Sequence, residues 1–138
     1  RKFLLLVLLG MAAAAPADAQ SRSERRAVEK AGWVPDGEPV SCIDRARLRE
    51  TRVLDDSTID FIMNNGQRFR NTLPNRCPQL GFNEAFGYQT SINQLCNVDI
   101  ITVVQTVGSP TRGASCGLGM FQPMKRAETL ASTAAPKP

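Results

Sequence analysis

The sequence predicts an all-β fold, a small antiparallel barrel or sandwich with two disulfides, flanked by disordered arms. Three observations favour this class. Strand-like segments recur about every 8–15 residues, and no long amphipathic helix separates them. The dipeptide Asn65-Gly66 lies between two alternating segments, which is a strong hairpin signal because both residues can adopt positive φ. An even number of cysteines follows an apolar leader, as in exported disulfide-bonded domains.

Residues 1–19 are expected to be a secretory signal peptide. Two basic residues precede an apolar run over residues 3–15, and residues 17–19 (Ala-Asp-Ala) form a cleavage pattern. The run is shorter than the about 20 residues of a spanning helix. We therefore expect cleavage after Ala19, no stable membrane anchor afterwards, and a periplasmic or secreted protein.

The rest of the chain divides by composition. Residues 20–40 are polar, and Pro35, Gly37 and Pro39 near their end are typical loop residues, so the segment is expected to form a flexible arm. Trp33 lies in this arm and is expected to dock onto the domain. Residues 41–124 form the predicted disulfide-stapled β-domain. Residues 125–138 are rich in small residues and proline and are expected to be a flexible tail.

Strands are predicted in order along the domain. Asp55-Asp56-Ser57 reads as a turn, because such side chains bond nearby backbone groups. In the following strand Ile59, Phe61 and Met63 share one face. The segment 43–50 is compatible with a strand or a short helix. The predicted strands cover residues 52–54, 58–63, 67–73, 95–104 and 115–121, with the apolar segment 95–104 in the centre.

The aromatic side chains are expected to form the core rather than a binding platform, because large rings bury much apolar area. They are Phe61, Phe69, Phe82, Phe86, Tyr88 and Phe121.

The four cysteines are expected to form two disulfides. Zinc sites favour closely spaced cysteine pairs or histidines, and this chain has neither. Three pairings are compatible with four cysteines. We predict Cys42–Cys116 with Cys77–Cys96, which would tie the ends of the domain together and close an inner loop.

The segments Val53–Phe61, Phe69–Leu80, Phe86–Tyr88, Leu95–Ile101 and Cys116–Gly119 together resemble a family of small exported Gram-negative bacterial proteins catalogued as a domain of unknown function. The resemblance covers about residues 42–121. It implies a single periplasmic domain, and it implies no reaction and no catalytic residue.

The sequence offers little catalytic chemistry. It has no histidine, so Ser-His-Asp and Cys-His systems are absent, and it has no phosphate-binding loop motif. Neither a cofactor nor a metal is expected. A calcium site from Asp55, Asp56 and Asp60 is an alternative, but the spaced oxygen ligands of calcium loops are missing. Removing Arg1, Lys2 and Asp18 lowers the net charge from +4 to +3, which does not indicate nucleic-acid binding.

Asp99 is the candidate ligand-binding carboxylate. It lies within the apolar segment 95–104, where a carboxylate must face solvent, pair with arginine or accept backbone hydrogen bonds. The simpler expectation is a salt bridge with Arg68 or Arg70.

The leading hypothesis is a non-catalytic binding or envelope-associated protein whose partner is an envelope protein or glycan. One alternative is a hydrolase that uses carboxylates on envelope glycan. The other is a hydrolase inhibitor that acts through the loop 108–113.

Overall fold

The computed structural model describes residues 17–128. The predicted signal peptide lies outside the described residues except for residues 17–19, and so does the tail beyond residue 128. Within residues 17–128 no helix is both long and apolar enough to cross a membrane.

Helix α1 (Ala17–Ala31) comes first, and the short helices η1 (Arg45–Arg47) and α2 (Leu80–Asn83) lie between strands. The strands are β1 (Trp33–Pro35), β2 (Cys42–Asp44), β3 (Leu48–Asp55), β4 (Thr58–Met63), β5 (Arg68–Thr72), β6 (Phe86–Tyr88), β7 (Gln94–Cys96), β8 (Ile100–Gln105), β9 (Thr111–Gly117) and β10 (Phe121–Arg126).

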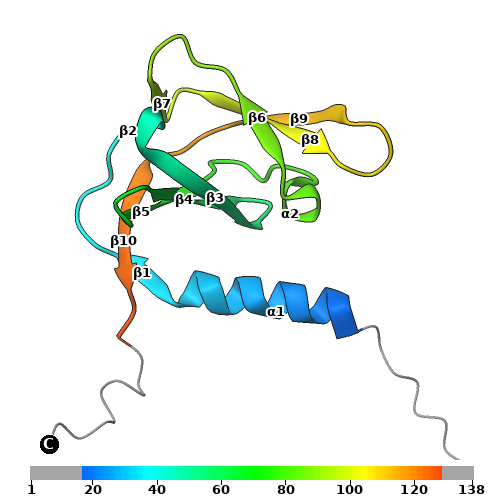
Figure 1. The fold of residues 1–138 in the computed structure, drawn as a ribbon, viewed down its shortest axis with the longest axis horizontal. Helices are drawn as coiled ribbons and strands as arrows, with labels where there is room; N and C mark the ends of the chain where they lie inside the picture. The colour runs from blue at the N-terminus through cyan, green and yellow to red at the C-terminus, as the bar shows by residue number, and fades with distance from the viewer. Residues whose placement is uncertain (1–16, 129–138) are drawn as a thin grey trace, which may run out of the picture.

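The strands form three antiparallel sheets, which confirms the all-β prediction (Figure 1). The largest has the order β1-β10-β5-β4-β3, the second has the order β6-β8-β9, and β2 pairs with β7. Strand β10 enters the first sheet from the far end of the chain and brings the two ends of the domain together. The ambiguous segment 43–50 contains parts of two strands and the short helix η1.

The β4–β5 hairpin is confirmed, but its turn differs from the predicted one. Only Gly66 in the loop has positive φ, at 86°. The backbone N–H of Gly66 donates to the carbonyl of Met63, and the N–H of Met63 donates to the carbonyl of Gln67. A loop with a single left-handed glycine at its end is typical of three-residue hairpin connections, so the loop is one residue longer than the Asn-Gly pair alone suggests.

The predicted central strand 95–104 is divided into β7 and β8. Between them Asp99 Oδ2 accepts a 2.7 Å hydrogen bond from the backbone N–H of Cys96, and the N–H of Asp99 donates to the carbonyl of Cys96. These local bonds turn the chain and end the ladder of β7. Strand β8 is nevertheless the central strand of its sheet.

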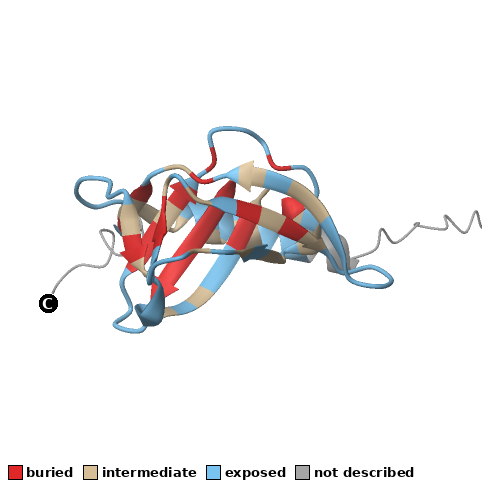
Figure 2. Cartoon of the chain, turned by 90° about the horizontal axis from the view of Figure 1, so that it is seen from above, coloured by how far each residue is buried: buried red, intermediate tan, exposed pale blue. Residues whose placement is uncertain are grey.

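One core joins the sheets, with its buried residues in the middle of the molecule (Figure 2). Phe61 of β4 makes edge-on contacts with Phe86 of β6 and Phe121 of β10, at centroid distances of 6.3 and 5.3 Å. The aromatic core prediction holds for these rings. It is wrong for Phe82, which is 67% exposed because it lies on the outer side of the single-turn helix α2.

The prediction of a flexible arm over residues 20–40 is wrong. Residues 17–31 form α1, and β1 pairs with β10 at the edge of the large sheet. Trp33 is docked, as expected, with the guanidinium of Arg68 over its ring. The contacts that hold α1 are polar, so the sequence has no apolar periodicity from which this helix could be predicted. The domain also reaches Arg126 in β10, two residues into the predicted tail.

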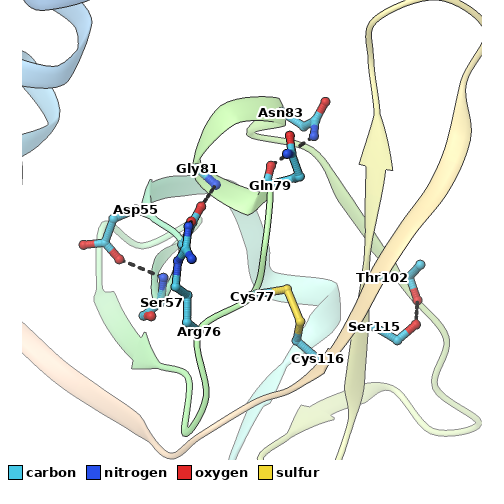
Figure 3. Close-up of a disulfide and its surroundings, with 11 residues drawn as sticks. Asp55, Ser57, Arg76, Cys77, Gln79, Gly81, Asn83, Thr102, Ser115 and Cys116 are labelled. Carbon is cyan, nitrogen blue, oxygen red and sulfur yellow. Dashed lines mark hydrogen bonds and ion pairs between the residues drawn. A yellow bond between two sulfur atoms is a disulfide. The ribbon is translucent and has the colours of Figure 1, made fainter.

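Both predicted disulfides are wrong. The bonds are Cys42–Cys96 and Cys77–Cys116, and no cysteine is free. Figure 3 shows the Cys77–Cys116 bond. Cys42 and Cys96 face each other across the β2–β7 pair, with their Cα atoms 4.0 Å apart. This pairing leaves the corner residue Cys77 for Cys116 of β9, at a Cα distance of 5.8 Å. Two disulfides are typical of a protein that folds in an oxidising compartment.

Candidate functional site

An open groove of about 530 Å³ runs along the outer face of β8, between β6 and β9. Strand alternation creates it. Ile101 and Val103 point inward and are fully buried, so Ile100, Thr102 and Val104 face outward and form the floor.

A glycine deepens the groove. Gly87 of β6 lies opposite Thr102, and a Cβ atom built on it would meet no other atom within 4 Å. The absence of a side chain there leaves the apolar floor uncovered from that side. Ile100 is 58% exposed and Val98, in the turn before it, is 81% exposed. Neighbouring large apolar side chains this accessible are typical of an interaction surface.

Charged residues mark the two ends of the groove. Asp99 precedes the first residue of β8, and Arg112 of β9 pairs in register with Val104. At about 3.3 Å per residue the two positions are about 16 Å apart along the strand. An elongated ligand with an apolar middle and opposite charges at its ends would match this pattern.

The predicted salt bridge of Asp99 with Arg68 or Arg70 is wrong. Among the described residues the carboxylate of Asp99 accepts one hydrogen bond, from the backbone N–H of Cys96. This is the third environment that the sequence allowed, a carboxylate that bonds the backbone of its own turn. The bond holds Asp99 at the end of the groove, where its carboxylate could contact a ligand.

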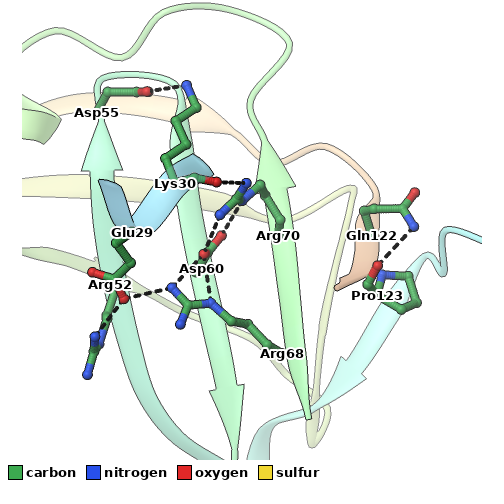
Figure 4. Close-up of polar contacts among 9 residues, drawn as sticks. All are labelled: Glu29, Lys30, Arg52, Asp55, Asp60, Arg68, Arg70, Gln122 and Pro123. Atoms are coloured by element: carbon green, nitrogen blue, oxygen red, sulfur yellow. Dashed lines mark hydrogen bonds and ion pairs between the residues drawn. The ribbon is translucent and has the colours of Figure 1, made fainter. Parts of the chain in front are cut away.

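Arg68 and Arg70 instead bind Asp60, which is fully buried in the neighbouring strand β4 (Figure 4). Asp60 Oδ1 accepts from Arg70 Nε at 2.7 Å, and Asp60 Oδ2 accepts from Arg68 Nε at 2.8 Å. Arg68 also donates to Glu29 of α1, which accepts from Arg52 as well. Sequence reasoning missed this cluster. The hairpin register was a usable signal, because it places Asp60 directly opposite Arg70.

Helix α1 is attached to the rest of the domain through this cluster and further polar contacts, two of which are ion pairs. Lys30 pairs with Asp55 at 2.7 Å, and Arg26 pairs with Glu84 at 2.9 Å. No side chain of α1 from residue 22 onward is buried. Partly exposed ion pairs contribute roughly 0.2–1 kcal/mol each, so the helix is held much less firmly than the strands of the core.

Of the other two aspartates in the calcium alternative, Asp55 stabilises a turn and Asp56 binds the backbone of α2. Asp55 Oδ1 accepts from the backbone N–H of Ser57, which confirms the predicted turn (Figure 3). Asp56 accepts from the backbone N–H of Gly81 and pairs with Arg76. Asp55, Asp56 and Asp60 therefore each have different partners. Among residues 17–128, no three His, Cys, Asp or Glu side chains form a group that could hold a metal ion.

The carboxyl groups that hold α1 have shifted pKa values. Burial raises the pKa of Glu29, but hydrogen bonds from Arg68 and Arg52 outweigh it and the pKa is lowered. Burial likewise raises the pKa of Asp55, and the hydrogen bond from Lys30 helps to bring it below its usual value. Both carboxylates are thus stabilised in the charged form in the folded protein.

Acidification is expected to release α1. The folded-state pKa values lie below the ordinary values of 4.5 for Glu29 and 3.8 for Asp55. The charged carboxylates therefore stabilise the attachment of α1 fully when the pH is above the ordinary values. This stabilisation is lost as the pH falls through the lowered pKa values. Hydrogen exchange of the amides of residues 22–31, corrected for intrinsic rates, should accelerate between pH 6 and about pH 3. Equal protection at both pH values would contradict this, and the amides of β4 serve as the internal control.

Comparisons of the chain with protein-family models, curated proteins and solved structures found no match. The resemblance to the family of unknown function therefore stays a prediction.

Proposed function

We propose that this protein is an exported, non-catalytic binding protein of the periplasm or cell exterior, and that the groove on β8 binds an extended segment of an envelope protein. The observation that carries the proposal is the exposed apolar floor between Asp99 and Arg112. An extended segment lying along β8 would cover Ile100 and Val98. Its own charged groups would lie opposite Asp99 and Arg112. The disulfides support the exported location, since they form in oxidising compartments.

The distribution of carboxylates supports a non-catalytic role. A glycosidase needs two carboxyl groups about 5–9.5 Å apart on either side of a sugar. Asp99 is the one carboxylate among the described residues that line the groove. The other aspartates described above are held by arginine, lysine or backbone donors. A glycan hydrolase is therefore the less favoured alternative.

The inhibitor alternative is favoured by one feature. The loop between β8 and β9 projects from the domain, and Val107 in this loop is 74% exposed (Figure 1). Such a loop could enter the active site of a hydrolase. A fall in lysozyme activity on addition of excess protein would favour this alternative over the groove.

The Ile100→Asp substitution is expected to reduce partner binding by at least tenfold. Burying a large aliphatic side chain contributes about 1.5–3 kcal/mol, and a charge in its place would remain unpaired. A photo-cross-linking residue at Val98 in the producing cells would report occupancy of the groove. The cross-linked product should be abundant in the otherwise unchanged protein and at least tenfold weaker with Ile100→Asp.

Val107→Asp is the matched control, because it adds the same charge at an exposed aliphatic position outside the groove. Both substitutions are expected to change the free energy of unfolding by less than about 0.5 kcal/mol, as at other exposed positions. Equal cross-linking in the unchanged protein and in Ile100→Asp would reject the groove as the binding site. Loss of the cross-linked product with Val107→Asp, but not with Ile100→Asp, would point to the projecting loop instead.

A further inference from the structure

A second cavity, of about 640 Å³, lies beside Trp33 and shares no residue with the groove on β8. We call it the Trp33 cavity and define it by Glu29, Trp33, Arg52, Arg68 and Arg126. Three of these five side chains are guanidinium groups from β3, β5 and β10. The fold therefore brings positive charge from three separate strands to one open space.

The arginines crowd one indole ring. The guanidinium carbon of Arg68 lies 4.5 Å from the ring centroid of Trp33, and that of Arg126 lies 5.3 Å from it. Each contact is favourable by itself, but two like charges on one ring repel each other unless an anion is near. Arg126 makes no ion pair with the described residues. Its donors are available to a ligand in the cavity.

The anion already present comes from α1 rather than from the sheet. Glu29 Oε1 accepts from Arg52 Nη1 at 2.5 Å and from Arg68 Nη2 at 2.8 Å. A single carboxylate oxygen thus sits between two guanidinium groups (Figure 4). Glu128 also lines the cavity and is exposed.

Asp60 and Glu29 have different roles in this arrangement. Asp60 is fully buried and binds Arg68 and Arg70 from within the sheet, so it belongs to the fold itself. Glu29 retains 23% of its side-chain exposure and reaches the arginines from the solvent side. An anion from solution could reach the position of Glu29 but not the position of Asp60.

We propose that the Trp33 cavity binds a phosphate group, which takes the place of the Glu29 carboxylate between Arg52 and Arg68 and also contacts Arg126. A phosphate has more negative charge and more acceptor oxygens than a carboxylate, and guanidinium groups bind it through paired hydrogen bonds. Helix α1 is held by polar contacts without a buried side chain from residue 22 onward, so loss of the Glu29 contacts loosens it. Helix α1 thus covers the site and occupies it with the Glu29 carboxylate.

Trp33 is the only tryptophan of the chain, and its fluorescence therefore reports on the cavity directly. The purified protein is titrated with inorganic phosphate at constant ionic strength, with chloride as the control anion. Phosphate should change the fluorescence in a saturable way, and chloride should not. An equal response to the two anions would mean ionic screening only and would overturn the proposal.

Two substitutions give opposite expectations. Glu29→Gln removes the competing carboxylate and should tighten phosphate binding at least fivefold, whereas Arg126→Gln removes a ligand contact and should weaken it at least fivefold. Glu24→Gln is the matched control, because Glu24 is an exposed residue of the same helix and does not line the cavity. Unchanged affinity in both Glu29→Gln and Arg126→Gln would overturn the site. Equal tightening by Glu24→Gln would show a general charge effect and would overturn it as well.

Hydrogen exchange tests the movement of α1. Saturating phosphate should accelerate exchange of the amides of residues 22–31 in the unchanged protein, and slower exchange would overturn the displacement of Glu29. Two further probes separate the sources of the phosphate group. Tighter binding to phosphatidylglycerol vesicles than to phosphatidylcholine vesicles would identify a lipid headgroup, and binding to a soluble phosphomonoester alone would identify a small ligand. Failure of every phosphate probe would reject the site while leaving the groove on β8 unaffected.

Discussion

Asp60→Asn is expected to lower the free energy of unfolding by about 3–5 kcal/mol, because breaking a buried ion pair leaves the partner charges uncompensated. Asp60 is fully buried, and Arg68 retains only 5% of its side-chain exposure. An asparagine has almost the same shape, so the effect isolates the charge. Its amide oxygen can accept from one arginine, but its NH₂ group would face the other. Urea unfolding followed by far-UV circular dichroism measures the change.

Asp36→Asn is the control for this substitution. Asp36 is exposed in the segment after β1, and its loss is expected to change stability by less than about 0.5 kcal/mol. A loss below about 1 kcal/mol for Asp60→Asn would contradict the prediction. It would mean that Glu29 or solvent replaces the missing charge.

Removal of the Cys77–Cys116 disulfide by a double alanine substitution is expected to cost about 4 kcal/mol, from the chain entropy of the loop that it closes. The two cysteines are 39 residues apart in sequence. Cys77 is fully buried in the core, so alanine there also leaves a small cavity. Thermal unfolding of the double variant beside the oxidised protein measures the loss.

Peptide mapping of the unsubstituted, oxidised protein tests the pairing itself. Digestion without reduction should release one peptide pair that contains Cys42 with Cys96 and another that contains Cys77 with Cys116. Recovery of a Cys42–Cys116 pair would contradict the structure. A stability loss below about 1 kcal/mol in the double variant would show that the core holds Cys77 and Cys116 in place without their covalent bond.

Local features of this protein could be predicted from the sequence. The β4–β5 hairpin, the turn at Asp55 and the inward-facing residues of β4 all follow from interactions within a few positions of the chain. Strand alternation needs only neighbouring residues, and so does a side chain that bonds the backbone two residues later. The all-β class follows from the repetition of such local patterns.

Part of the candidate site was visible in the same way. Asp99 could be selected because a carboxylate within an apolar segment needs a specific environment. That environment could not be chosen from the sequence, because the bond to Cys96 depends on a turn that divides the apolar segment into β7 and β8. The apolar floor on Ile100 was also hidden, since exposure depends on the sheet that covers only one face of β8.

The sequence by itself determined the antiparallel β-class, the presence of two disulfides and the absence of histidine chemistry. Only the tertiary structure decided which cysteines pair, that residues 17–35 belong to the domain, and that Arg68 of β5 also meets Glu29 of α1. The physical reason is the range of the interactions. Residues 39 positions apart, such as Glu29 and Arg68, meet through the packing of whole elements, and ion pairs leave no periodic pattern along the chain.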